Sequence, residues 1–297
     1  MVQFDRRGFM QAAATAVISA RLVPAVRAED TAKPRKFQLG TVTYNVAKDL
    51  DLPTLLDVCQ KTGIAAVELR TTHRHGVEPA LSAEERRDVR KRLADSGVVF
   101  WGCGSVCEFH APEAAKVREN IEMCKKFVRL TADLGGKGVK VRPNGLPKGV
   151  PEEKTLEQIG HSLIECGKAA ADAGIEIWVE VHGGGTSLPT NVKTFMDHCG
   201  HASVGLTWNS NGTDLVKGSV AEGFALLKPW IKSCHINDLE NDAKGVYPYR
   251  ELFRLLREIG YDRYTMCEVG RTPKTVEAVI EFYKNYKAQW EELSKPA

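Results

Sequence analysis

Four segments in the second half of the chain carry residues that could together bind a metal ion. Glu180 lies in Trp-Val-Glu-Val-His, Asn209 in Thr-Trp-Asn-Ser, His235 in Cys-His-Ile-Asn and Glu268 in Met-Cys-Glu-Val. An ionised carboxylate is costly in such apolar surroundings unless a cation or a hydrogen-bond donor pairs with it. Two carboxylates, one imidazole and one amide oxygen suit a divalent ion such as Mn, Mg, Co or Zn. We therefore predict one metal site formed by these four residues.

The elements that must position these residues follow a regular pattern. Short runs rich in β-branched and apolar residues alternate with longer segments of helical periodicity, which is typical of consecutive βα units. The predicted strands are residues 38–44, 65–70, 98–103, 138–142, 175–181, 203–207, 231–236 and 264–269. The predicted helices are residues 52–61, 83–96, 112–134, 151–173, 191–199, 220–228, 249–259 and 274–293.

The spacing of the strands indicates the α/β architecture. Strand ends recur at intervals of about 26 to 39 residues, close to the roughly 31 residues per unit of an eightfold barrel. A doubly wound sheet is the competing arrangement, but no Gly-x-Gly-x-x-Gly follows the first strand. A solenoid would need repeats that resemble one another, and these do not. We expect a single (β/α)8 TIM barrel over residues 36–297.

Polar residues stand at or just past every predicted strand end, and in such a barrel the chemistry lies at the C-terminal ends of the strands. Single residues also have a structural interpretation. Glu180 could form a buried ion pair with Arg142, and His235 could hydrogen-bond a backbone carbonyl. The convergence of four residues from four successive strands favours a functional mouth.

The order and spacing of these motifs resemble the xylose isomerase-like TIM barrel superfamily, also known as the sugar phosphate isomerase/epimerase family. The resemblance extends over residues 36 to about 290 and is most specific in the last four strands. In that family a Glu, an Asp, a His and a Glu at the ends of strands 5 to 8 bind one divalent metal ion. Glu180, His235 and Glu268 match this pattern, whereas Asn209 replaces the Asp. Loss of that carboxylate should weaken the binding of a hard cation.

Two other residues could supply the missing ligand. His182 lies two residues past Glu180, on the same side of the strand, and it could bind either the metal ion or the substrate. Asp214 would be the ligand if the sixth strand were misregistered.

The resemblance implies an enzyme that moves a proton at the carbon beside a carbonyl. Glu180 and Glu268 would be the acid–base pair, and His235 and Asn209 would complete the metal shell. Trp101 or Trp208 could form an apolar wall for a sugar ring. The residues implied to bind the sugar or polyol substrate are Glu68, Trp101, His110, Lys140, Arg142 and His182.

Other functions fit the same residues to different degrees. A lyase or dehydratase acting on a keto-sugar or keto-glycoside would use the same proton abstraction before expelling a substituent. A non-catalytic sugar-binding barrel is a further alternative, because Asn209 is a change that a degenerate enzyme would carry. The three-zinc site of endonuclease IV is disfavoured, because the Asp and His that the family often carries on strand 6 are absent.

Residues 1–28 resemble a twin-arginine export signal. They contain Asp-Arg-Arg-Gly-Phe-Met, then a stretch rich in Ala and Val that is too short to span a bilayer, and a small residue, Ala28, at the end. We expect cleavage after Ala28, a linker over residues 29–35, and a periplasmic or secreted protein without a membrane anchor. Export would favour a free sugar, keto-sugar or glycoside over a sugar phosphate as substrate.

Composition is consistent with this assignment. The formal charge of +3 resides entirely in the expected leader, which holds four arginines and one aspartate, so the rest has no net attraction for nucleic acid. The 8 cysteines form no Cys-x-x-Cys pair, and we expect buried free thiols, with a disulfide as the alternative. A homo-oligomer is possible.

Overall fold

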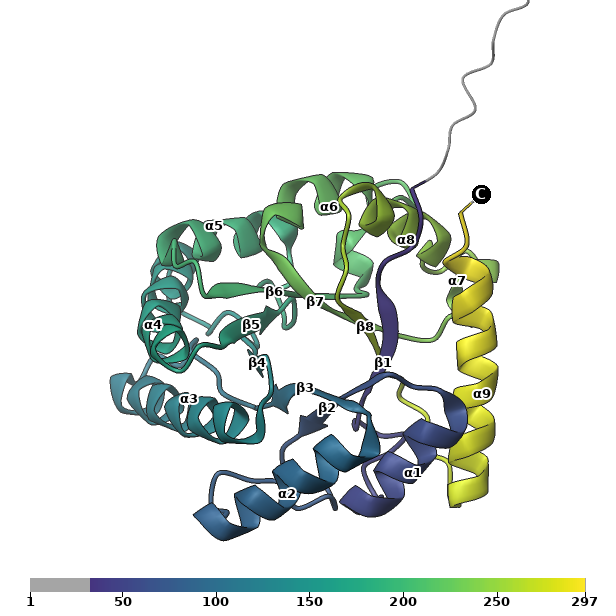
Figure 1. The fold of residues 1–297 in the computed structure, drawn as a ribbon. Helices are drawn as coiled ribbons and strands as arrows, with labels where there is room; N and C mark the ends of the chain where they lie inside the picture. Colours follow the sequence, from purple (N-terminus) through teal and green to yellow (C-terminus); the bar gives the residue numbers. More distant parts are fainter. Residues whose placement is uncertain (1–32, 297) are drawn as a thin grey trace, which may run out of the picture. The chain divides into compact units, whose positions relative to one another are not determined.

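The computed structural model describes residues 33–296 and contains a closed barrel of eight strands in chain order (Figure 1). All neighbouring strands are parallel, and β1 pairs with β8, so the sheet has no free edge. The strands are β1 Gln38–Val42, β2 Ala66–Arg70, β3 Val99–Gly104, β4 Gly138–Val141, β5 Glu176–Glu180, β6 Val204–Asn209, β7 Ile231–Ile236 and β8 Tyr264–Cys267. The predicted barrel is confirmed.

Helices follow the strands and surround the barrel (Figure 1). They are α1 Leu52–Thr62, α2 Ala83–Ser96, α3 Ala114–Leu134, α4 Glu152–Asp172, α5 Pro189–Cys199, α6 Ala221–Leu227, α7 Glu240–Ala243, α8 Tyr249–Glu258 and α9 Val276–Leu293. The short helix α7 and two 3-10 turns, η1 Gly212–Asp214 and η2 Lys228–Trp230, were not predicted. The expected export signal and the first residues of the linker lie outside the described residues.

Local signals in the sequence explain where several helices begin and end. Ser82 accepts a hydrogen bond from the backbone of Glu85 while the Glu85 carboxylate accepts one from Ser82, which caps the first turn of α2. Helix α1 ends at Gly63, whose φ of 69° is a left-handed conformation that glycine adopts without a steric penalty. Such stops make each helix return promptly to the next strand.

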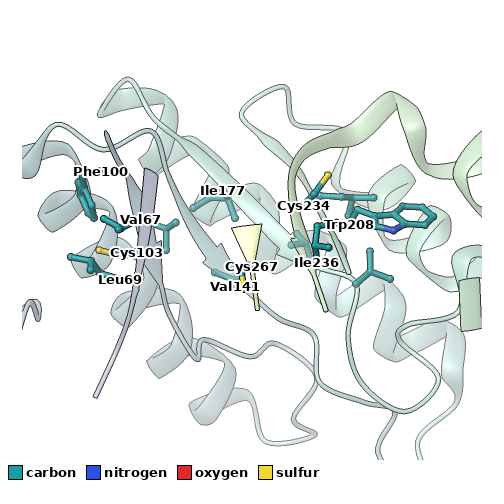
Figure 2. Close-up of a cluster of buried hydrophobic side chains, with 14 of the residues drawn as sticks. Val67, Leu69, Phe100, Cys103, Val141, Ile177, Trp208, Cys234, Ile236 and Cys267 are labelled. Atoms are coloured by element: carbon teal, nitrogen blue, oxygen red, sulfur yellow. The ribbon is translucent and has the colours of Figure 1, made fainter. Parts of the chain in front are cut away.

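The main hydrophobic core lies between the strands and the helices (Figure 2). Every second strand residue points outward into it, as Val67, Leu69 and Ile177 do. All eight cysteines are buried and unpaired, which confirms the expectation of free thiols. Between residues 33 and 296, no helix combines the length and hydropathy that crossing a membrane requires.

A second, smaller cluster fills the inside of the barrel and forms a floor. It contains Val42, Ala66, Trp101, Trp178 and Met266. The two indole rings stack with centroids 4.7 Å apart and planes at 19°. This floor depends on a glycine in β4, because a Cβ at position 138 would lie 2.4 Å from the Trp178 ring.

We expect Gly138→Ala to lower the free energy of unfolding by about 1–3 kcal/mol, because the added methyl group must displace the Trp178 ring. Urea denaturation measures this loss. Gly184→Ala is the matched control, since a Cβ there meets no atom within 4 Å. Equal stability of the two variants would show that the floor accommodates the added methyl group without cost.

Candidate functional site

The layer directly above the floor is polar. Residues two positions beyond the floor residues on the same strands face the same interior, so Glu180 stands above Trp178 and Glu268 above Met266. The layer is completed from other strands, and its members are Glu68, Lys140, Glu180, Asn209, His235 and Glu268. All except Glu268 are buried.

His235 is the centre of this layer. Its Nε2 lies 3.1 Å from Glu68 Oε2, and its Nδ1 lies 3.1 Å from Glu268 Oε2 and 3.9 Å from Glu180 Oε1. Burial disfavours protonation of the imidazole, but the carboxylates of Glu268 and Glu68 outweigh it and raise the pKa of His235 well above its usual value. The side chain therefore links two carboxylates as a cation.

Glu180 is held by two donors. Lys140 Nζ lies 2.7 Å from its Oε2, and Asn209 Nδ2 donates to its Oε1 over 3.2 Å. Burial alone would raise the pKa of Glu180, but the charge of Lys140 prevails, helped by His235, and the pKa is about 2. The alternative interpretation, a buried ion pair between Glu180 and Arg142, does not apply among the described residues. Arg142 instead binds Glu108, with Nη2 2.9 Å from Oε1.

These residues fit a divalent ion. Glu180, His235 and Glu268 each offer a ligand atom, and the three atoms lie within 4.8 Å of one another. The Glu68 carboxylate at Nε2 directs a proton to that nitrogen and leaves Nδ1, which has no aligned hydrogen-bond partner, available as a ligand. Metal binding would replace the second proton of His235.

The side-chain amide of Asn209 is not oriented as a metal ligand would be, with its oxygen toward the ion. Its Nδ2 faces Glu180, and its Oδ1 accepts a hydrogen bond of 3.0 Å from the backbone nitrogen of Ser210. In this arrangement the amide holds Glu180 in place, and the assignment of Asn209 as a ligand stays a prediction.

A cavity of about 330 Å³ opens above the layer. Its lining consists of Tyr44, Arg70, Lys140, Arg142, Glu180, His182, Asn209, Asn211, Asn237 and Glu268. The structure thus brings Lys140, Arg142 and His182 to one cavity, as predicted from the strand ends. His182 Nδ1 is buried without a hydrogen-bond partner, which leaves that atom available to a ligand.

Three of the predicted substrate-binding residues lie outside this lining. Glu68 is fully buried beneath it against His235. Trp101 belongs to the floor, where its Nε1 donates to Ser233 Oγ over 3.2 Å. His110 follows Glu108 beyond β3 and has a buried Nδ1 without a partner.

The lining includes Arg70 and Asn237, which sequence reasoning did not place at the mouth of the barrel. Arg70 is two positions beyond Glu68 on β2, and Asn237 is two positions beyond His235. The two-residue period of a strand could have identified both, because it places them on the inner face.

Trp208 and Asp214 form a separate buried cluster. Trp208 Nε1 donates to Tyr247 Oη over 3.0 Å, and Tyr247 donates to Asp214 Oδ2 over 2.8 Å. Trp208 belongs to the outer core, and Asp214 is not part of the group of three metal-ligand candidates. Burial raises the pKa of Asp214 to about 7, and its Oδ1 has no partner.

This shift predicts a pH dependence of stability. Below pH 4 the Asp214 carboxyl is protonated in both states, whereas between pH 4 and 7 only the unfolded chain ionises, so stability falls as the pH rises. Ionisation of Asp214 should lower the free energy of unfolding by roughly 3–4 kcal/mol between pH 4 and 7. We expect this decrease to be absent in Asp214→Asn. Denaturant unfolding at several pH values measures it, with exposed Asp262→Asn as control. Parallel profiles for wild type and Asp214→Asn would contradict the shift.

Comparisons with solved structures agree on the fold. A D-psicose 3-epimerase crystallised in the presence of D-fructose is 16% identical with a TM-score of 0.73, covering 87% of this chain and 99% of that one. The 3-keto-D-glucoside 4-epimerase of E. coli is 14% identical with a TM-score of 0.70, over 86% and 100%. A zinc-bound IolI protein is 19% identical with a TM-score of 0.71, over 87% and 98%.

No curated protein sequence matches the chain. The family model described as xylose isomerase-like TIM barrel, in contrast, matches residues 56–286. That range covers well over half of the chain and includes all of the polar layer. The chain therefore belongs to the xylose isomerase-like TIM barrel family.

Proposed function

We propose that the protein is a sugar isomerase or epimerase that moves a proton at the carbon beside a carbonyl, assisted by a divalent metal ion. The observation that carries this proposal is that Glu180 and Glu268 line one cavity, with His235 Nδ1 between them. Two carboxylates on either side of a bound carbon can act as base and acid in turn.

The residues of the polar layer have distinct roles in this reaction. A divalent ion held by Glu180, His235 and Glu268 would stabilise negative charge that develops on the substrate oxygens. Glu180 and Glu268 exchange the proton at the carbon. Lys140 keeps Glu180 ionised and fixed through their 2.7 Å contact. Arg142 and His182 hold the substrate hydroxyls from the rim.

The proposed substrate is a free keto-sugar or a related polyol. The neighbouring structures include epimerases of D-psicose and of a 3-keto-D-glucoside, which are carbonyl-bearing sugars. The proposed export signal also favours a substrate without a phosphate. A dehydratase is also among the neighbours, a probable 3-DHS dehydratase from Bacillus anthracis, and a product that has lost one water relative to the substrate would identify that reaction instead.

We expect Glu180→Gln and Glu268→Gln each to reduce the incorporation of solvent deuterium into a keto-sugar by about 10²–10⁴-fold, because an amide cannot accept the proton. Mass spectrometry of D-fructose or D-psicose incubated in D₂O measures exchange. Glu119→Gln, on the exposed face of α3, is the control for a lost carboxylate. Undiminished exchange in both site variants would refute the acid–base assignment, and saturable sugar binding without exchange would indicate a binding protein.

Asn209→Asp should tighten the binding of Mn or Co by about tenfold or more, because the added carboxylate supplies a negative ligand. Isothermal titration with the metal alone measures the affinity, and Asn285→Asp on exposed α9 controls for a change in net charge. Unchanged affinity would show that position 209 does not contact the ion. Less than about 0.2 equivalents of metal in the loaded wild-type protein would refute the metal centre itself.

A further inference from the structure

The cationic side chains of the cavity differ in how they are neutralised. Lys140 contacts Glu180 over 2.7 Å, and Arg142 contacts Glu108 over 2.9 Å. The third cation of the lining is Arg70 at the end of β2. In the part of the chain that the structure describes, no ion pair includes Arg70.

The contacts of Arg70 are all with uncharged groups. Its Nη1 lies 3.4 Å from the Thr71 carbonyl oxygen and 3.4 Å from His73 Nε2, and its guanidinium lies over the Tyr44 ring at 5.6 Å. Burial and the nearby charge of Arg70 lower the pKa of His73 to about 4, so this imidazole is neutral. A half-buried guanidinium facing a cavity with its charge unpaired attracts an anion more strongly than an exposed one.

The surrounding loop holds Arg70 in a fixed position. The Arg70 backbone nitrogen donates to Thr43 Oγ1 over 3.0 Å, and its carbonyl oxygen accepts a hydrogen bond of 2.8 Å from His75 Nε2. The nearby carboxylate of Glu78 is engaged elsewhere, by the Thr71 hydroxyl at 2.8 Å and the Thr72 backbone nitrogen at 2.6 Å. It binds the loop together and leaves the guanidinium free.

The same loop contains backbone strain. Thr72 has φ of 66°, a left-handed conformation that is unfavourable for a β-branched residue and persists only where surrounding contacts enforce it. Strain of this kind is concentrated at ligand-binding sites. Here it lies two residues beyond Arg70.

Besides its acidic and basic residues, the cavity has amide and imidazole side chains in its lining. His182, Asn209, Asn211 and Asn237 line it from β5 to β7 and beyond. Amide and imidazole groups suit hydroxyl groups, whereas a guanidinium suits a planar carboxylate, which it can bind through two parallel hydrogen bonds. The lining therefore matches a polyol that carries one negative charge.

We propose that Arg70 is the carboxylate-binding residue of this cavity and that the substrate is an acidic sugar, a keto-sugar with a carboxylate at one end. This inference rests on the proposed function and narrows its substrate class. The cavity of about 330 Å³ is large enough for a six-carbon sugar acid.

A carboxylate explains the site better than a phosphate. Phosphate groups in TIM barrels are commonly bound by the loops after strands 7 and 8. A cation in that position here, Arg271, already contacts Asp238 at 2.6 Å and Glu240 at 3.2 Å. One unpaired guanidinium matches the single charge of a carboxylate.

Isothermal titration of the full chain with four six-carbon keto-sugars tests the proposal. D-fructuronate and 2-keto-D-gluconate carry a carboxylate at opposite ends of the chain, D-fructose is the neutral reference, and D-fructose 6-phosphate tests the phosphate. At least one acid should bind about tenfold or more tighter than D-fructose. Arg70→Met should abolish that preference, because it lowers the affinity for the acid about tenfold or more beyond any change in the affinity for D-fructose. Arg74→Met, exposed in the same loop, should retain the preference.

Several outcomes would overturn the inference. These are equal binding of all four sugars by wild type, tighter binding of the phosphate than of either acid, and an undiminished preference in Arg70→Met. Arg70→Lys, which keeps the charge, should retain part of the preference, and circular dichroism checks that both variants are folded. Arg70-dependent binding without proton exchange would support this subsite while refuting the proposed reaction. Exchange on D-fructose that is equal in wild type and Arg70→Met, with no preference for an acid, would do the reverse.

Discussion

The charge balance of one buried layer governs the structure of this barrel. Glu68, Glu180 and Glu268 place three carboxylates at the barrel interior, two of them buried, where unpaired charge is very costly. Lys140 compensates Glu180, and a single imidazole, His235, is shared between the other two. A fourth carboxylate would leave this layer with a larger negative excess, and Asn209 avoids it while still donating to Glu180. The amide that departs from the family pattern is therefore consistent with a lysine in the same layer.

The two-residue period of β-strands relates the polar layer to the residues below and above it in the barrel. On several strands the charged residue has an interior residue below it and a cavity-lining residue above it. Strand β4 and the residue after it, for example, supply Gly138, Lys140 and Arg142 in succession. The small residue makes room for the stacked indoles, the middle one neutralises a carboxylate, and the last reaches the mouth. Stability and chemistry are thus separated by height along the barrel axis, in agreement with the general anatomy of TIM barrels.

The sequence was sufficient for the fold and for most of the polar layer, because β-branched runs, helical periodicity and terminal glycines are local signals. The partner of Glu180 was not predictable in the same way. In the ladder between β4 and β5, Val141 is level with Val179, so a flat sheet would place Arg142 beside Glu180. Strands of such barrels are tilted by about 36° to the barrel axis. Residues at one height along the axis are therefore not partners in the ladder, and Lys140 is the residue beside Glu180. Trp101 lies in the floor and not in the cavity lining. This position was not predictable either, since β3 meets β2 across an irregular register that no local pattern reveals.

The stacked pair of Trp101 and Trp178 fills the barrel interior below the polar layer, so the cavity above that layer has a floor. Product therefore departs on the side of the barrel from which the next substrate arrives. Substrate and product would then occupy the same cavity in turn, and accumulated product would inhibit substrate binding competitively. For a reversible reaction, the concentrations outside the mouth then decide its direction.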